Sequence, residues 1–130
     1  MYKQTTKDIT VSVEPVYLEE ESSPGNNRYF WAYHILIQNN GSESVQLHKR
    51  FWQITDSAGL TQEISGEGVI GEQPFVEPGK SYAYTSGAPL NTPGGMMVGN
   101  YTMKNGEGEM FTVDIPAFSL DSPHQNAIMH

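Results

Sequence analysis

Residues 28–38 read Arg-Tyr-Phe-Trp-Ala-Tyr-His-Ile-Leu-Ile-Gln, the strongest strand signal in the chain. Its side chains form two alternating rows, Tyr29, Trp31, Tyr33, Ile35 and Ile37 in one and Phe30, Ala32, His34 and Leu36 in the other. Successive side chains of a β-strand point to opposite faces of its sheet. Both rows are largely apolar, as is typical of a strand with neighbours on both sides. The stretch therefore predicts a central β-strand.

Alternating stretches of the same kind recur on both sides of residues 28–38, separated by turn signals, and no segment keeps a helical period. We expect further strands over residues 9–18, 45–55, 60–64, 81–85, 96–104 and 109–120. Pro15 interrupts the first of these, so that we expect an edge strand with a break. With about seven strands, each with an apolar face, the sequence predicts an all-β fold. The expected architecture is a two-sheet antiparallel sandwich of the immunoglobulin or fibronectin type III-like kind.

Several short segments carry the composition of turns. Asp56-Ser57-Ala58-Gly59 predicts a type I turn with a glycine bulge, and Glu77-Pro78-Gly79-Lys80 predicts a type II turn. Asn105-Gly106 between two alternating runs predicts a hairpin. Residues 86–95 are rich in proline and glycine and read as a loop, whereas residues 1–7 and 121–130 lack a regular pattern and read as irregular tails.

The bulk composition limits the classes of function. A chain of 130 residues is expected to form one domain, residues 1–130, and it contains no cysteine for a disulfide or a thiolate site. Seven basic against fifteen acidic side chains give a formal charge of −8, which disfavours nucleic acid as a partner. The short basic group at residues 48–50 reads as alternate side chains of a strand that point to solvent. No signal-like or membrane-spanning apolar run is present, so we expect a cytoplasmic protein that does not bind a membrane.

A G-x-G-x-x-G string, with Gly66, Gly68 and Gly71, lies near the middle of the chain. In dinucleotide-binding folds such glycines let the backbone approach a pyrophosphate where a helix begins. Here Pro74 and the turn at residues 78–79 leave no room for a helix, and Glu67 and Glu72 would repel a phosphate. We interpret the string as a turn or bulge between strands, with an anion- or nucleotide-binding loop at Gly66, Gly68 and Gly71 as the alternative.

Residue patterns for catalysis are lacking. The four histidines, at positions 34, 48, 124 and 130, have no metal-ligand spacing, and His34 reads as a hydrogen-bonded structural residue. Neither Ser65-Gly66 nor Ser86-Gly87 completes the nucleophile motif G-x-S-x-G. We therefore expect no catalytic residues, no metal site and no cofactor. Residues 86–100, rich in Pro, Met and Gly, are better suited to contacting a protein partner.

The order of motifs resembles the bacterial ApaG family. The matching stretches are RYFWAYHILIQN, VQLHKRFWQITD, GEGVIGEQP, EPGKSYAYTSG, TPGGMMVGNYTM and FTVDIPAFSL, which together run from about Asp8 to Leu120. GEGVIGEQP and YTSG are the most specific of them. The resemblance implies a fibronectin type III-like sandwich, in agreement with the strand pattern. Ile70 stands where many relatives have valine.

The same resemblance implies a small bacterial protein without an established enzymatic activity. The family is genetically linked to diadenosine tetraphosphate hydrolysis and to cobalt and magnesium tolerance, and related domains in eukaryotic proteins are taken to be protein-interaction modules. We therefore expect a non-enzymatic module for protein–protein interaction. A binder of a nucleotide or pyrophosphate-containing small molecule through the loop from Gly66 to Gly71 is the alternative, and divalent-cation binding by acidic loops is a third.

Overall fold

The structure, a computed structural model, describes residues 1–125. These residues contain nine strands, one short 3-10 turn and no α-helix. The elements are β1 (Tyr2–Thr6), β2 (Ile9–Tyr17), η1 (Pro24–Asn26), β3 (Tyr29–Asn39), β4 (Val45–Asp56), β5 (Thr61–Glu67), β6 (Phe75–Val76), β7 (Ser81–Leu90), β8 (Gly95–Lys104) and β9 (Met110–Leu120). All seven predicted strands are present, so the prediction of an all-β chain is confirmed.

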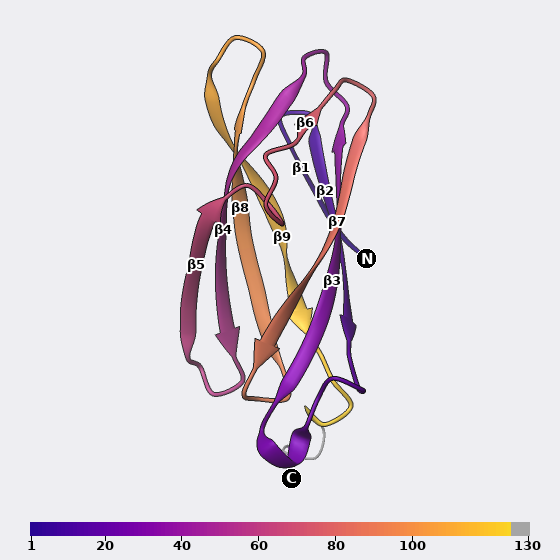
Figure 1. Ribbon diagram of the computed structural model, residues 1–130, viewed down its shortest axis with the longest axis vertical. Coiled ribbons are helices and arrows are strands. Elements are labelled where there is room, and N and C mark those ends of the chain that lie inside the picture. Colours follow the sequence, from indigo (N-terminus) through magenta and orange to yellow (C-terminus); the bar gives the residue numbers. More distant parts are fainter. Residues whose placement is uncertain (126–130) are drawn as a thin grey trace.

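The strands form two antiparallel sheets that pack face to face as a sandwich (Figure 1). One sheet has the order β1-β2-β3-β7, and the other has the order β5-β4-β8-β9 with β6 paired to β4. Residues 29–39 lie between β2 and β7, which confirms the prediction of a central strand. The predicted fibronectin type III-like sandwich is therefore the observed fold.

The core lies between the two inner faces. One row of β3, Tyr29 to Ile37 at every second residue, is buried, whereas His34 on the other row is exposed. At the centre, Tyr33, Trp52 and Phe118 make mutual edge-on or tilted ring contacts with centroids 5.3 to 5.9 Å apart. Such aromatic pairs add about 0.5–1.5 kcal/mol beyond the burial of their apolar area. Because these rings come from β3, β4 and β9, they join the two sheets.

Residues 2–6, predicted as an irregular tail, instead form strand β1 beside β2. The β1–β2 turn places Lys7 and Asp8 at φ angles of 46° and 68°, the left-handed conformation of a type I′ hairpin turn. Tyr2–Thr6 shows no buried row, and a Lys-Asp pair is not a usual signal for this turn. For both reasons, the sequence pattern does not predict this hairpin.

Pro15 does not break its strand, contrary to the expectation of an interrupted edge strand. Strand β2 runs unbroken from Ile9 to Tyr17, and Pro15 pairs with Tyr33 of β3. The pairing of β2 with β1 ends at Val13. Beyond that residue β2 has a neighbour on one side only, where a proline without an N–H is tolerated.

The predicted turns hold, with one difference. Gly59 and Gly79 have positive φ angles of 87° and 77°, and the Lys80 amide donates to the Glu77 carbonyl at 2.9 Å. In the β8–β9 hairpin the residue with positive φ is Gly108, not Gly106. The Asn105 side chain accepts hydrogen bonds from the amides of residues 107 and 109, and this makes the loop longer than a two-residue Asn-Gly turn.

Residues 86–95, predicted as a loop, are mostly strand. β7 continues to Leu90 and β8 begins at Gly95, so the turn is confined to residues 91–94. Gly87 and Pro89 lie inside β7, where their partners in β3 are Ala32 and Phe30. Pairing with β3 outweighs the weak strand propensity of these residues.

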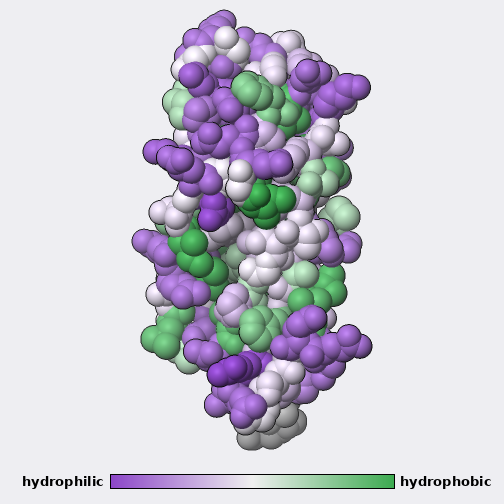
Figure 2. Space-filling view, viewed as in Figure 1, coloured by the Kyte–Doolittle hydropathy of each residue, from purple (hydrophilic) through white to green (hydrophobic). Residues whose placement is uncertain are grey.

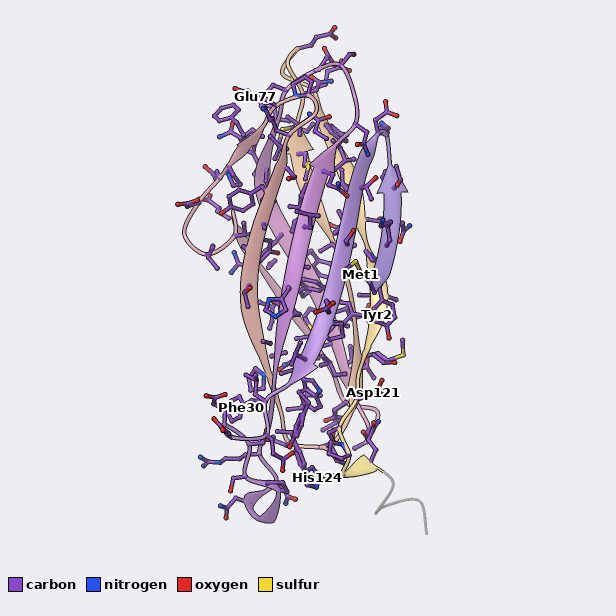
Figure 3. All side chains as sticks on the ribbon, turned by 90° about the vertical axis from the view of Figure 1, so that its right-hand side faces the viewer. Met1, Tyr2, Phe30, Glu77, Asp121 and His124 are labelled. Carbon is purple, nitrogen blue, oxygen red and sulfur yellow. The ribbon has the colours of Figure 1, made fainter. Side chains whose placement is uncertain are left out.

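The chain after β9 turns back over one end of the sandwich. The Trp31 indole donates to the Asp121 carbonyl at 2.8 Å, and the Ser122 hydroxyl donates to the Pro93 carbonyl at 2.6 Å. Asp121 and His124 lie at the end of the molecule opposite Glu77 (Figure 3). Residues 121–125 are irregular, as predicted; residues 126–130 lie outside the described part of the chain.

Candidate functional site

The glycine string begins inside β5 and ends in a small hairpin. Gly66 pairs with Arg50 of β4 as a strand residue. Val69 and Glu72 form a reciprocal pair, each amide donating to the other's carbonyl at 2.8 and 2.9 Å. Between them, Ile70 and Gly71 have positive φ angles of 43° and 81°, the geometry of a type I′ turn. The string therefore forms a turn and starts no helix, as predicted.

Gly68 and Val69 fix this turn to the sandwich. A Cβ atom at Gly68 would lie 2.1 Å from the Glu72 carbonyl oxygen, so that only glycine fits there. The Val69 side chain is buried in the core, although it lies outside any long strand. At the far side of the turn, the Tyr82 hydroxyl of β7 donates to Glu72 Oε2 at 3.0 Å. The loop thus links the edge of one sheet to the edge of the other.

Arg50 supplies a positive charge that the loop's own sequence lacks. Its Nη1 donates to the carbonyl oxygens of Glu67 and Gly68 at 3.1 and 2.9 Å. The guanidinium lies so close to Gly66 that a Cβ there would be 2.9 Å from Nη2. Residues 48–50 are expected to be alternate strand side chains that point to solvent; Lys49 is exposed, whereas Arg50 lies on the inner face with Trp52 and is partly covered.

The backbone amides of the loop are largely used within the protein. Gly68 donates to the His48 carbonyl at 2.7 Å, and Val69 and Glu72 donate to each other. An anion nest needs several adjacent amides directed at a common ligand. The three glycines predicted as an anion site also differ in position: Gly66 is in a strand, Gly68 in a close contact and Gly71 at the exposed turn. A nucleotide site at Gly66, Gly68 and Gly71 stays a prediction.

A second polar cluster is buried between the sheets. The hydroxyls of Tyr84 (β7) and Tyr101 (β8) hydrogen-bond to each other at 2.5 Å, and both side chains are buried. Burial raises the pKa of both phenols above the ordinary value, and it also raises the pKa of Tyr33. These tyrosines stay neutral at physiological pH. Because the hydrogen bond joins β7 of one sheet to β8 of the other, the pair links the two sheets.

The histidines lie apart from one another. His34 Nδ1 hydrogen-bonds to Thr85 Oγ1 at 2.7 Å, which confirms the predicted bond, although its side chain is exposed and not buried. His48 occupies a β-bulge in β4, and its Nε2 is buried. His124 packs between the rings of Tyr17 and Tyr29 and is not freely solvated. His130 lies outside the described residues.

The outer face of the five-stranded sheet carries an exposed apolar surface that sequence reasoning only partly located. Met96 and Val98 of β8 are 51% and 41% exposed, whereas Met97 between them is buried. They line a shallow groove of about 610 Å³ together with Gln53 and Thr55 of β4 and Ala117 and Ser119 of β9. We call this surface the β8 face. The predicted contact segment, residues 86–100, contributes Met96 and Val98, but as strand residues and not as a loop.

These observations define a class of protein, an all-β, fibronectin type III-like sandwich. In residues 1–125, no group of three or more His, Cys, Asp or Glu side chains is placed to hold a metal ion. The same residues contain no helix long and apolar enough to cross a membrane.

The family model of the ApaG domain matches residues 19–105, which is more than half of the chain, and the chain therefore belongs to the ApaG family. Protein ApaG of Methylorubrum populi is 58% identical over 130 residues and covers the whole of both chains. Protein ApaG of Parvibaculum lavamentivorans is 53% identical over the same length, again with full coverage. The predicted family is confirmed.

Solved structures agree with this assignment. The crystal structure of an ApaA protein from Bordetella pertussis superposes with a TM-score of 0.87 at 44% identity, covering 91% of this chain and 96% of that one. The C-terminal domain of wzt has a TM-score of 0.57 at 12% identity, and it shows the shared fold alone.

Proposed function

We propose that the chain is a non-enzymatic binding module that recognises a protein partner through the β8 face. The observation that carries the proposal is the pair Met96 and Val98, two large apolar side chains that a strand of the sandwich presents to solvent over a groove. Exposed apolar clusters of this kind mark interaction surfaces on soluble domains.

The charge around the groove indicates what kind of partner surface fits. Asp56 and Asp121 lie at its margin, and the chain as a whole carries a formal charge of −8. A partner with an apolar centre and basic side chains around it would complement this face and would be steered to it. We place the interaction in the cellular setting that the family resemblance implies, cobalt and magnesium tolerance and diadenosine polyphosphate metabolism.

Site-specific photocrosslinking in cells tests the proposal. A benzoylphenylalanine at Val98 should give a discrete crosslinked product, and the same residue at Ala83, exposed on the outer face of the other sheet, is the matched control. The Met96→Glu substitution should abolish the product, because a charged carboxylate replaces the apolar side chain at the groove and the apolar contact with the partner is lost. Equal products from both positions, or none from Val98, would count against the β8 face.

A further inference from the structure

Strand β5 is an outer strand of the described chain whose free edge pairs with no other strand and contains no proline. The edges of β1 and β9 lie against each other: the Asp114 amide donates to Thr6 Oγ1 and the Ser119 amide to the Tyr2 hydroxyl, both at 3.3 Å (Figure 3). β7, the other outer strand, contains Pro89 near its end. A proline lacks the N–H that a further strand would need.

β5 stands at the margin of the sandwich (Figure 1), and six of its seven residues are exposed. The strand has the sequence Thr-Gln-Glu-Ile-Ser-Gly-Glu, without the proline or lysine that often blocks an exposed edge. The side of the molecule seen in Figure 2 shows apolar groups as separate patches among polar side chains. A partner bound at the β5 edge would gain more binding free energy from backbone hydrogen bonds than from a broad apolar contact.

The hydrogen bonds at the two ends of the β4–β5 ladder decide which backbone groups are free. The Asp56 amide donates to the Leu60 carbonyl, and the Gly68 amide donates to the His48 carbonyl. Antiparallel pairs alternate between bonded and non-bonded, so the bonded β5 residues between these ends are 62, 64 and 66. Residues 61, 63 and 65 therefore direct their N–H and C=O groups away from β4, toward solvent, whereas the carbonyl of Glu67 already accepts from Arg50 Nη1.

The side chains of β5 differ between its two faces. Glu63 and Glu67 lie on the outer face, opposite Gln53 and Lys49 of β4. Ile64 lies on the inner face, opposite Trp52, but it is 41% exposed because the other sheet does not extend over it. The edge therefore offers two carboxylates on one face and an uncovered aliphatic side chain on the other.

We propose that the outward edge of β5 binds an extended basic peptide segment of a partner protein as an additional strand. Neighbouring side chains on paired strands share a face, so lysine or arginine would lie beside Glu63 and Glu67 and an aliphatic residue beside Ile64. In antiparallel register this places basic residues at the first and fifth positions of the segment and an aliphatic residue at the fourth. A second copy of this chain fits less well, because paired β5 strands would bring carboxylates together.

This inference rests on the proposed function only in assigning the chain to protein recognition; it concerns a different surface and adds a peptide chemistry. The probe is a fluorescein-labelled peptide with the central sequence Arg-Ser-Thr-Val-Arg, titrated with the full-length protein and followed by fluorescence anisotropy. In antiparallel register its threonine pairs with Ser65, and the threonine N–H faces β5.

Two modifications test backbone pairing directly. Ser65→Pro removes an outward N–H and no bond to β4, and it should weaken binding at least tenfold, whereas Ser65→Ala should leave binding unchanged. On the wild-type protein, N-methylation of the peptide's threonine should weaken binding by a similar factor, and N-methylation of its serine, whose N–H faces away, should weaken it much less. The peptide test holds even where Ser65→Pro lowers the melting temperature.

The outcomes separate the possibilities. Equal binding of the two N-methylated peptides, or of Ser65→Pro and wild type, would overturn strand addition and leave a purely electrostatic contact. No binding at millimolar protein, or a protein dimer that Ser65→Pro dissociates, would also overturn the proposal, the latter in favour of a second copy. Loss of the Val98 crosslink by Met96→Glu with unchanged peptide binding would show the two surfaces to be independent, so that one proposal can fail while the other stands.

Discussion

Arg50 lies across Gly66, and its Nη1 holds the carbonyl oxygens of Glu67 and Gly68 at 3.1 and 2.9 Å. The residue that organises the glycine loop thus comes from the neighbouring strand and not from the loop. Its guanidinium satisfies carbonyl groups, and the loop amides at residues 68, 69 and 72 donate within the protein. In this geometry the glycines allow the positive φ angles and close backbone contacts that the turn requires.

The three glycines should respond differently to alanine. Gly68→Ala should lower the free energy of unfolding by about 3 kcal/mol or more, because its Cβ would overlap the Glu72 carbonyl and its φ is positive. Gly71→Ala has free space and should cost only about 1 kcal/mol of backbone strain. Gly66→Ala should cost about 1 kcal/mol, since the flexible end of Arg50 can move. Urea unfolding measures all three, and equal losses would contradict this reading of the loop.

Ile70 is a β-branched residue held at a φ of 43° and 58% exposed. Asparagine adopts this left-handed conformation more readily, so Ile70→Asn should raise the free energy of unfolding by about 1 kcal/mol. Ile64→Asn is the matched control, because Ile64 is also a partly exposed isoleucine but lies in a strand. The control should not stabilise the protein. Thermal unfolding of both variants measures the change in stability. If Ile70→Asn did not stabilise the protein, the turn would carry no backbone strain at Ile70.

The buried tyrosines make the fold sensitive to alkali. Burial raises the pKa of Tyr84 and Tyr101 above the ordinary value of about 10. Above about pH 10 the unfolded chain releases protons that the folded chain retains, so stability is full below this pH and is lost as pH rises further. We expect the ionisation of these phenols, followed by absorbance near 295 nm, to coincide with unfolding followed by circular dichroism.

Phenylalanine variants provide the control for this pH dependence. Tyr84→Phe alone leaves the buried Tyr101 hydroxyl without its partner and should cost about 1–3 kcal/mol at neutral pH. The double variant Tyr84→Phe/Tyr101→Phe should recover part of this loss. Its stability should fall less steeply above about pH 10. An unchanged alkaline slope in the double variant would exclude these two phenols as the cause.

Asn39 is buried and joins three segments. Its Nδ2 donates to the carbonyl oxygens of Glu43 and Val76 at 2.7 and 2.8 Å, and its Oδ1 accepts from the Gly41 amide. Asn39→Asp keeps the shape but loses both donors and places a charge against two carbonyls, so we expect a loss of about 3 kcal/mol or more at neutral pH. Chemical denaturation at several pH values measures it, and the loss should shrink as the carboxyl becomes protonated. A pH-independent loss would contradict this reading.

Local sequence signals were sufficient for most of the fold. The two apolar rows of residues 29–37 identified the central strand, and Gly59 and Gly79 marked their turns, because both signals depend only on neighbouring residues. Strand β1 lacks such a local signal, since Lys7-Asp8 adopts a turn that this residue pair seldom forms. The predicted strand over residues 81–85 ends before the end of β7, because the strand state at Gly87 and Pro89 comes from pairing with β3.

The candidate surfaces likewise combine features set by neighbouring residues with features set by strand pairing. The order of residues alone sets the alternation that buries one row of each strand, the glycines that the turns require, the acidic charge and the family. Three further features come from the packing of strands: Arg50 crosses to the glycine loop, Met96 and Val98 face solvent beside β4 and β9, and β5 is an outer strand. Those features depend on which strands become neighbours, and strand pairing joins residues far apart in the chain.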